Sequence, residues 1–485
     1  MRVVEEAEMR KLMPVAAVIS LILLLPLFFL VVGILQAPWY TQTYYGELPA
    51  MVEKLQNTEN RKIVVLGNSA VAFGVNSRQM EQELRTDGLE YSVCNFGLYG
   101  VIGTKAMLDL ALPELRQGDL VVFVPEQTRQ ALSLDFSGVE MWRAIDGNFS
   151  LFFRIAKENR GQMIAGFPSF VADKYAYRKQ GTEFVPSGIY SRDSFNENCD
   201  MVYDRPHNIM KDGYDPNNRV SFDPAIWQTD FIDYLNEFAE AAAKKGAEVC
   251  FAWCPVNSAS LVQDSDEAAI AAYYDFIDEK LMIPVISNPH NYLLEREWFY
   301  DSNFHMNSAG SVLYTYLLTD DIKSFLGDTE QSSVLLPEKP EMPAAQDIFE
   351  GDNSCENCFI YEKNDTGWVI AALTEEGQRT SDLVLPVTHN GEPVTDYSEE
   401  IFRSSTVLES IVFQKNIRLL YDDSFSGCKK LKIIELKQTS AAAVSVGFGL
   451  LNGTDQAYIR VPQESIAEYL NDYFWGHYAG HYETY

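Results

Sequence analysis

Basic side chains and histidines are scarce in this chain of 485 residues. It has 38 lysines and arginines against 69 aspartates and glutamates, a formal net charge of −31 at pH 7. This balance excludes a protein that wraps nucleic acid or covers an anionic membrane through basic patches. With only six histidines, few positions can supply a general base.

Cysteine is also sparse and irregular. The seven cysteines are an odd number without regular spacing, which excludes a disulfide-stapled scaffold. Cys355 and Cys358 form one C-x-x-C pair, "CENC", and no second pair follows it. A zinc site would need further ligands. The pair is therefore interpreted as a local disulfide or two free thiols, and no metal is expected.

One long segment carries no charge. Residues 13–40 read "MPVAAVISLILLLPLFFLVVGILQAPWY", long enough to cross a hydrocarbon core of about 30 Å. Arg2, Arg10 and Lys11 precede it, and the next basic residue is Lys54. The positive-inside rule then predicts a cytoplasmic N-terminus at 1–12, a single-pass anchor and an extracellular body. A cleaved signal peptide is the alternative, but the apolar run is longer than usual and no small-x-small site follows it.

After this segment, short apolar runs alternate with stretches of helical periodicity. The expected strands begin with "KIVVLG" from Lys62, "YSVCNFG" from Tyr91, "DLVVFVP" from Asp119, "AEVCFAWCP" from Ala247 and "LMIPVIS" from Leu281. The expected helices are 104–117, 229–245, 265–281 and 307–325. Fully apolar short runs are typical of a parallel sheet covered on both faces. The pattern predicts a three-layer α/β domain over 41–331.

Two segments interrupt this order. Residues 138–222 are rich in aromatics, Asn, Asp and Gly, and are expected to be an insertion, helical first and then loop-like, that either covers the site or has no role. Residues 332–350 include the proline-rich "SSVLLPEKPEMPAAQ" and are predicted to be an extended linker.

Beyond the linker, residues 351–485 contain approximate repeats of about 20–25 residues, the signature of a solenoid. A short apolar strand is followed by a polar turn and an aromatic, such as Phe402 or Phe425. "YDDSFSGCKKLKIIEL" and "AYIRVPQESIAEYLNDYFWGHYAGHY" resemble the leucine-rich repeats of BspA-like bacterial surface proteins. The resemblance covers about 359–485, with 440–453 departing from the repeat. It implies a β-rich solenoid with an adhesive or ligand-facing role and no catalytic residue.

The expected strand "KIVVLG" ends on Gly67 and is followed by Asn68 and Ser69. Such a serine can be a helix N-cap, a phosphate ligand or a nucleophile. A nucleophile needs a base and an acid that orients the base. "FYDSNFHMNSAG" supplies both, with Asp301 four residues before His305. His305 as a structural loop histidine and Asp301 as an ordinary acid are the alternatives.

These segments resemble the SGNH (GDSL-like) hydrolase superfamily. "LGNSAV" matches its first block, with Ser69 as nucleophile, and "DSNFHMNSAG" matches its last, with His305 as base and Asp301 as orienting acid. "CNFGLYG" matches the second block, which implies that the backbone amides of Ser69 and Gly100 form the oxyanion hole. Gly97 and Gly100 as turn glycines of positive φ are the alternative. The resemblance implies a flavodoxin-like fold.

Two features depart from that pattern. Asp and His are separated by three residues instead of two, and the third block, which offers an asparagine, is not recognisable. Glu126 and Gln127 follow "DLVVFVP", where that block is expected. An anionic glutamate would oppose an oxyanion, so Gln127 is the better donor, with Asn257 in "CPVNS" as a second possibility. Membrane-anchored relatives, which look like the lipoteichoic acid D-alanylation protein and alginate O-acetyltransferases, share this departure.

The sequence thus suggests a membrane-anchored serine esterase or O-acyltransferase on the bacterial cell surface. Its expected substrates are acyl esters, above all acetyl esters, of cell-envelope or extracellular glycans, and it needs no cofactor. The repeats would contact a surface protein or glycan, and no nucleic acid partner is expected. The alternative is a non-catalytic, adhesin-like protein that binds glycan or protein through a degenerate SGNH domain and the repeats.

Overall fold

The computed structural model describes residues 24–25, 28, 31–33, 35–179, 188–328, 334–342, 350–364, 367–454, 456–472 and 474–485. The predicted anchor at 13–40 falls largely outside these ranges, as do parts of the predicted linker. Within them, no helix is both long and apolar enough to cross a membrane.

A four-stranded parallel sheet forms the centre of the first unit, in the order β2-β1-β3-β4. The strands are β1 (Lys62–Gly67), β2 (Ser92–Gly97), β3 (Leu120–Val124) and β4 (Glu248–Phe251), and nearly every residue in them is buried. Burial on both faces explains the absence of polar alternation. The run from Leu281 forms no strand beside β4, only a single bridge between Phe251 and Val285. Pro284 has no N–H to donate to a ladder.

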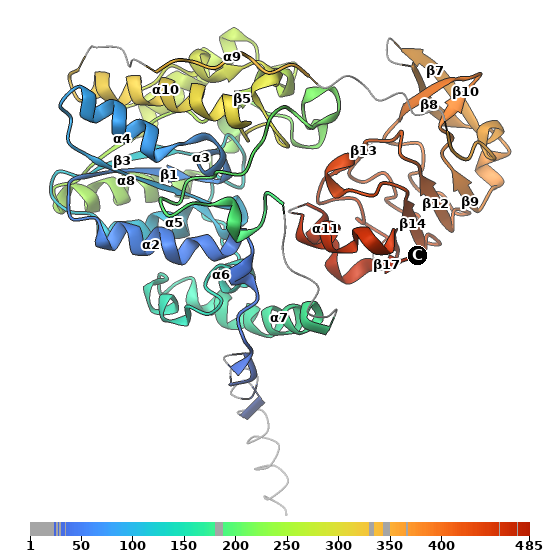
Figure 1. Cartoon of the computed structure of the whole chain (residues 1–485), viewed down its shortest axis with the longest axis horizontal. Helices are drawn as coiled ribbons and strands as arrows, with labels where there is room; N and C mark the ends of the chain where they lie inside the picture. Colours follow the sequence, from blue (N-terminus) through green and yellow to red (C-terminus); the bar gives the residue numbers. More distant parts are fainter. Residues whose placement is uncertain are drawn as a thin grey trace, which may run out of the picture.

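Helices lie on both sides of this sheet, which gives three layers (Figure 1). They are α2 (Leu48–Asn57), α3 (Ser69–Gly74), α4 (Ser77–Thr86), α5 (Thr104–Ala111), α8 (Thr229–Lys244), α9 (Glu267–Lys280) and α10 (Ser308–Phe325). The expected helix 104–117 ends early as α5, and a 3-10 turn over Leu112–Glu114 follows it. Pro113 lies in that turn and cannot donate an α-helical hydrogen bond.

Buried ion pairs lie beneath the helices. Lys62 Nζ is 2.6 Å from Asp119 Oδ2, and their side chains are 0% and 2% exposed. Lys174 and Asp146 form a second pair, fully buried at 2.6 Å. Asp146 also accepts hydrogen bonds from the backbone N–H groups of Trp39 and Tyr40. This second pair therefore attaches the first described stretch of chain to the α/β unit.

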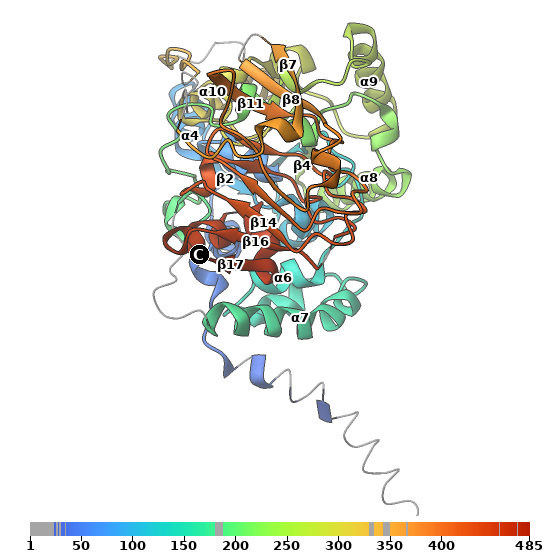
Figure 2. The same cartoon turned by 90° about the vertical axis from the view of Figure 1, so that its right-hand side faces the viewer.

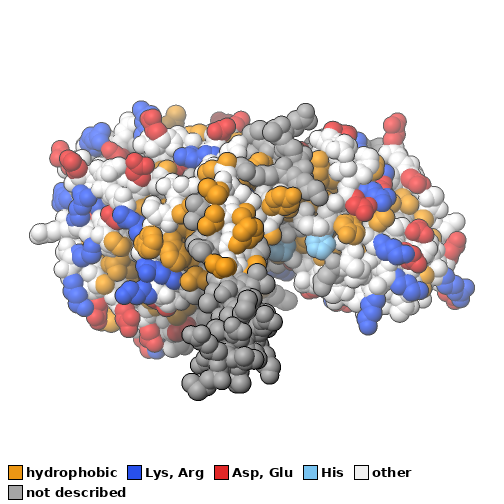
Figure 3. All heavy atoms as spheres, turned by 90° about the horizontal axis from the view of Figure 1, so that it is seen from below, with side chains coloured by type: hydrophobic (Ala, Val, Ile, Leu, Met, Phe, Trp, Pro, Cys, Tyr) orange, Lys and Arg blue, Asp and Glu red, His pale blue; other side chains and the backbone are white. Residues whose placement is uncertain are grey.

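Segment 138–222 begins with α6 (Gly138–Ala144) and α7 (Arg160–Lys179), and from 188 onward it consists of turns and short 3-10 helices. Helix α7 packs against the N-terminal residues. Gly33 lies so close to Phe167 and Val171 that a Cβ on this glycine would meet both side chains. Seen from this end, hydrophobic side chains gather on the surface (Figure 3). In this segment the most exposed of the described large hydrophobic side chains are Phe153, Ile164 and Tyr175, at 75%, 65% and 63%.

The second unit is a solenoid. Its main sheet is parallel, in the order β17-β16-β14-β12-β9, with strands β9 (Asp382–Val384), β12 (Ser410–Phe413), β14 (Ile433–Leu436), β16 (Tyr458–Val461) and β17 (Tyr482–Thr484). Ser410 pairs with Asp382 and Ile433 with Ser410, so these strands are 28 and 23 residues apart. Phe402 and Phe425 stack between consecutive turns, with ring centroids 5.7 Å apart.

Smaller elements complete the solenoid. A sheet in the order β10-β11-β8-β7 precedes it, with β7 (Phe359–Asn364), β8 (Gly367–Leu373), β10 (Thr388–His389) and β11 (Glu392–Tyr397). Within 440–453, β15 (Ser445–Val446) pairs with β13 (Leu419–Leu420) in a separate sheet, and α11 (Ile466–Asn471) precedes β17. In the remainder of the first unit, β5 (Val256–Asn257) pairs with β6 (Leu293–Leu294).

The two units lie side by side, with the solenoid facing the edge of the α/β unit that carries α3 (Figures 1 and 2). Residues 209–217 connect them. Lys211 forms an ion pair with Asp396, the Arg418 guanidinium donates to the Ile209 carbonyl, and the Asn217 amide donates to the Leu420 carbonyl. The solenoid therefore bears directly on a loop beside the candidate site.

Candidate active site

Ser69 lies at the end of β1, on the first residue of α3. The N-cap position belongs to Asn68, whose amide donates to Thr104 Oγ1 at 3.1 Å and whose side-chain oxygen accepts from the Glu126 backbone. The Ser69 hydroxyl is therefore not a capping group. Its side chain is directed to His305, and the residue is 8% exposed.

Two glycines allow the chain to pack closely around this turn. A Cβ at Gly67 would come within 2.1 Å of the Val124 carbonyl oxygen, and one at Gly97 within 2.6 Å of the Asn68 carbonyl oxygen. Neither Gly97 nor Gly100 has a positive φ. The need for glycine at 67 and 97 comes from close packing around Asn68 and not from turn geometry. Gly100 lies beside the Asn68 side chain, next to the nucleophile.

Ser69, His305 and Asp301 form a continuous hydrogen-bonded chain. His305 Nε2 is 2.8 Å from Ser69 Oγ, and His305 Nδ1 is 2.7 Å from Asp301 Oδ1. The His305 and Asp301 side chains are 4% and 13% exposed. The other oxygen of Asp301 accepts from the Tyr190 hydroxyl at 2.6 Å. These contacts give the imidazole one fixed orientation, with one nitrogen facing a carboxylate and the other a hydroxyl.

Aromatic packing holds the imidazole from the side. The ring of Phe73, on α3, stacks on His305 at a centroid distance of 3.8 Å. The guanidinium of Arg205 lies 5.3 Å from the centre of the same Phe73 ring. Burial lowers the pKa of Arg205 to about 10. His305 therefore lies between a buried positive charge, on Arg205, and a negative charge, on Asp301.

The loop that carries His305 is fixed by two asparagines. Asn303 donates to the carbonyls of Asp215 and Asn218, and its oxygen accepts from the Asp215 N–H. Asn307 caps α10 by accepting from the Gly310 N–H, and its amide donates to the carbonyls of Glu297 and Phe299. The Asp–His spacing of four positions is thereby accommodated in a rigid loop. This loop contacts residues 209–217 and, through them, the solenoid.

Glu126 contacts Ser69, although Gln127 was expected to be the better donor. Its Oε1 lies 2.8 Å from Ser69 Oγ and accepts from the Ala70 N–H, also at 2.8 Å. It follows β3, as the third block of the resemblance would. The signal that could have identified it is position alone, since the first polar side chain after a central strand reaches the edge where Ser69 lies.

The two residues expected as third oxyanion donors are engaged elsewhere. The Gln127 amide donates to the Pro125 carbonyl, and its oxygen accepts from Tyr273. The Asn257 amide donates to the Gly213 carbonyl, and its oxygen caps the following 3-10 turn. The structure thus brings neither amide into the contacts of Ser69. Gln127 points into the core because Tyr273 and Trp227 form a buried hydrogen-bonded pair there.

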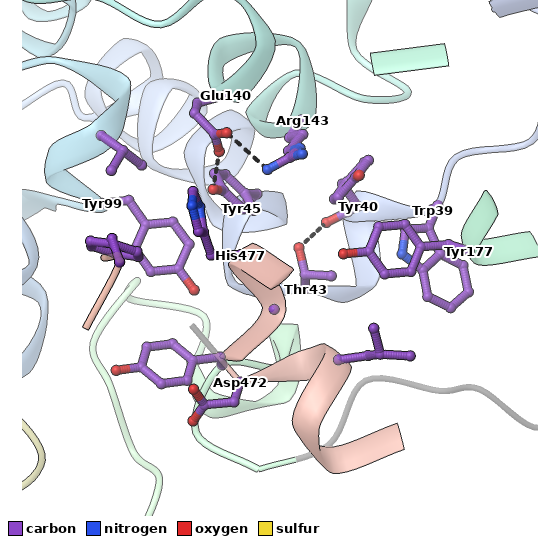
Figure 4. Close-up of a pocket in the computed structure, with 15 residues that line it drawn as sticks. Trp39, Tyr40, Thr43, Tyr45, Tyr99, Glu140, Arg143, Tyr177, Asp472 and His477 are labelled. Atoms are coloured by element: carbon purple, nitrogen blue, oxygen red, sulfur yellow. Dashed lines mark hydrogen bonds and ion pairs between the residues drawn. The ribbon is translucent and has the colours of Figure 1, made fainter. Parts of the chain in front are cut away.

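Two small cavities flank the site where the units meet. One, of about 100 Å³, is lined by both units, including Tyr99, Tyr190, Asp472 and His477 (Figure 4). The other, of about 60 Å³, is lined by Asp301 and by repeat residues, Asp472 among them. Burial raises the pKa of Asp472 to about 7. The repeat module therefore forms one wall of the space beside Asp301.

Among the described residues, no cluster of histidine, cysteine, aspartate or glutamate side chains could hold a metal ion. All seven cysteines are free thiols, including Cys355 and Cys358.

Comparisons with known proteins found similarity to solved structures alone. No protein-family model matches the chain, and no curated protein matches it. A leucine-rich cell surface protein from Faecalibacterium prausnitzii A2-165 is similar over 21% of this chain and 28% of its own, at 17% identity and a TM-score of 0.19. A leucine-rich repeat protein of T. pallidum is similar over 21% and 69%, at 17% identity and a TM-score of 0.16.

A third solved structure, protein YXIM of Bacillus subtilis, is similar over a larger part. The similarity covers 55% of this chain and 57% of the B. subtilis protein, at 13% identity and a TM-score of 0.26. The chain thus spans less than a third of the F. prausnitzii protein and little more than half of the B. subtilis one.

Proposed function

We propose that this protein is a serine esterase or O-acyltransferase of the SGNH type that acts on acyl esters, chiefly acetyl esters, of cell-envelope or extracellular glycans. The single observation that carries the proposal is the hydrogen-bonded chain from Ser69 Oγ through His305 to Asp301. Its order and distances meet the requirements of a nucleophile, a base and an orienting acid.

The mechanism follows from the contacts. Asp301 holds His305 with its proton on Nδ1, which leaves Nε2 free to take the proton of Ser69 as Oγ bonds to the ester carbonyl carbon. The carbonyl electrons move to oxygen, and the N–H groups of Ser69 and Gly100 would stabilise that charge. His305 then returns the proton to the leaving alcohol. Water or a glycan hydroxyl accepts the acyl group in the second half.

We further propose that the protein is attached to the outer face of a membrane. Exposed apolar side chains at the α7 end, together with Leu35 at 79% exposure, support an attachment there. The repeat module supports action on a polymer, since it forms one wall of both cavities beside the site. An acidic chain approaches polyanionic polymers less readily, which favours a neutral acetylated glycan.

The test is p-nitrophenyl acetate turnover by the full chain in detergent, beside the variants Ser69→Ala and His305→Ala. Both are expected to lose at least a hundredfold in kcat/KM. Ser258→Ala and His290→Ala change exposed residues of the same types and should match the parent protein. Turnover unaffected by Ser69→Ala would overturn the proposal.

The alternative of a non-catalytic glycan-binding protein has one observation in its favour. Glu126 places a carboxylate oxygen against the nucleophile, where a substrate carbonyl has to approach. In that case acetylated glycan would bind to the parent protein and to Ser69→Ala equally, with no acetate released from either.

A further inference from the structure

Helix α7 has an outer face without charged side chains, although the chain as a whole has a net charge of −31. A helix on the surface of a soluble protein normally turns charged and polar side chains outward. On α7 the exposed residues within 161–177 recur at helical spacing, and none of them is Asp, Glu, Lys, Arg or His. They are Gly161, Gln162, Ile164, Ala165, Pro168, Ser169, Ala172, Tyr175 and Ala176.

The stretch 161–177 contains two charged residues, and both are ion-paired within the α/β unit. Asp173 lies 2.8 Å from the guanidinium of Arg143 on α6, and Lys174 lies 2.6 Å from the buried Asp146. The Lys174 side chain is itself fully buried. The charges of the helix are therefore directed to partners inside the protein. This arrangement is expected where the medium outside is less polar than water, because an unpaired charge there is costly.

The uncharged N-terminal run leaves the α/β unit beside this helix. Gly33 lies against Phe167, and the ring of Trp39 stacks on Tyr177 at a centroid distance of 5.8 Å. Leu35, between these two contacts, is 79% exposed. Figures 1 and 2 show α7 running across the end of the unit from which this chain departs, and Figure 3 shows hydrophobic side chains gathered there. The N-terminal run and the outer face of α7 thus belong to one continuous surface.

We propose that the outer face of α7 lies on a phospholipid bilayer, as a second membrane contact beside the N-terminal run. This inference rests on the proposed attachment to the outer face of a membrane. An anchored chain already holds α7 at the lipid surface, so a modest apolar face is sufficient for contact. Phe153 extends this face, because the Arg160 guanidinium donates to its carbonyl and the ring is 75% exposed. Tyr175 presents the kind of ring that is enriched at membrane interfaces.

Two contacts with the bilayer fix the orientation of the α/β unit, which a single anchor leaves free to turn. Tyr177, on α7, lines the cavity of about 100 Å³ between the two units (Figure 4). Tyr190 lines the same cavity and donates to Asp301. One cavity therefore lies between the lipid-facing helix and the candidate site, and the site keeps one orientation relative to the membrane.

The experiment measures where α7 lies when the full chain is reconstituted in phosphatidylcholine vesicles. Ile164→Cys and Tyr175→Cys each carry a nitroxide label in a Cys355→Ser background, because the other six cysteines are buried. Met282→Cys, at a position 71% exposed that follows α9 on the side away from α7, is the matched control. Oxygen concentrates in the bilayer and a nickel chelate stays in water. The ratio of oxygen to nickel collisions is expected to be several-fold higher at 164 and 175 than at 282.

Flotation of the vesicles separates the two ways in which the inference can fail. A chain that does not float with the vesicles would overturn the attachment, and this inference with it. A chain that floats while the labels at 164 and 175 match the label at 282 would overturn the role of α7 alone. Labels shielded from both oxygen and nickel would mean that a second copy of the chain covers the face, which also overturns the lipid contact. No outcome depends on the serine mechanism, since no turnover is measured.

Discussion

Asp301→Asn is the substitution whose effect the structure defines most closely. Asp301 accepts from His305 through one oxygen and from the Tyr190 hydroxyl, at 2.6 Å, through the other. An asparagine can still accept from Tyr190, but only with its oxygen on that side. Its NH₂ group then faces His305 Nδ1 and donates to it. The imidazole proton moves to Nε2, where it points at Ser69 and blocks the base.

The expected loss of rate is large because the substitution moves the proton of His305 to the wrong nitrogen, even though the ring stays in place. In serine hydrolases this change costs about 10⁴ in kcat, or about 5.5 kcal/mol at 1.36 kcal/mol per tenfold. Tyr190 enforces the amide orientation here. Adding Tyr190→Phe to Asp301→Asn should therefore let the amide turn and recover part of the rate, about tenfold. Tyr190→Phe alone should lower kcat, since it removes a hydrogen bond to a charged group.

The assay is steady-state turnover of p-nitrophenyl acetate at the pH optimum, with circular dichroism to verify folding. Asp301→Glu, which keeps the charge, should lose less than Asp301→Asn. An Asp301→Asn protein within tenfold of the parent would refute the reasoning, as would a double variant slower than the product of the two single losses.

Three further predictions concern stability and reactivity. Lys62→Met should lower the free energy of unfolding by about 3–5 kcal/mol in urea titration, because Asp119 is left buried without its partner; an effect below 1 kcal/mol would contradict the buried pair. Burial raises the pKa of Glu47 to about 7, above its unfolded value, so the folded state binds the extra proton and stability falls as pH rises from about 4.5 to 7; Glu47→Gln should flatten that fall in thermal melts, and an unchanged slope would refute it. Under native conditions Ellman's reagent should react fastest with Cys355, the one cysteine of the seven that is not buried; fast reaction retained in Cys355→Ser would contradict this.

The hydrophobic pattern predicted the sheet closely. Continuous apolar runs marked β1 to β4 to within a few residues, because a strand covered on both faces leaves no room for alternation. The run from Leu281 had the same composition, yet Pro284 limits it to a bridge beside β4. Composition specifies burial, whereas pairing also requires donors that a proline cannot give.

The site was predictable where chemistry restricts residue type. Few histidines, and one aspartate four residues before His305, left little choice of base and acid, and the structure brings both to Ser69. The third contact of Ser69 was not predictable, because a side-chain amide was expected after β3 and a carboxyl group lies there instead. Glu126 contacts Ser69, while Gln127, one residue on, turns into the core. Alternation of side chains past a strand end, not residue type, decides which of the two faces the site.

The contact between the two units could not be read from the sequence either. Lys211 lies in a loop-like stretch, and Asp396 lies on β11 of the solenoid. Their approach depends on how two separately patterned modules pack. In the structure, residues of the repeats line the cavity beside Asp301.

The central claim is that Ser69 is a nucleophile activated by His305, and fluorophosphonate labelling tests it without any assumption about the substrate. The full chain is incubated with the reagent at the pH optimum, digested, and mapped by mass spectrometry. The account predicts a single adduct on the peptide that contains Ser69, formed at least a hundredfold more slowly in His305→Ala. No adduct on Ser69, or labelling at the same rate in His305→Ala, would contradict it.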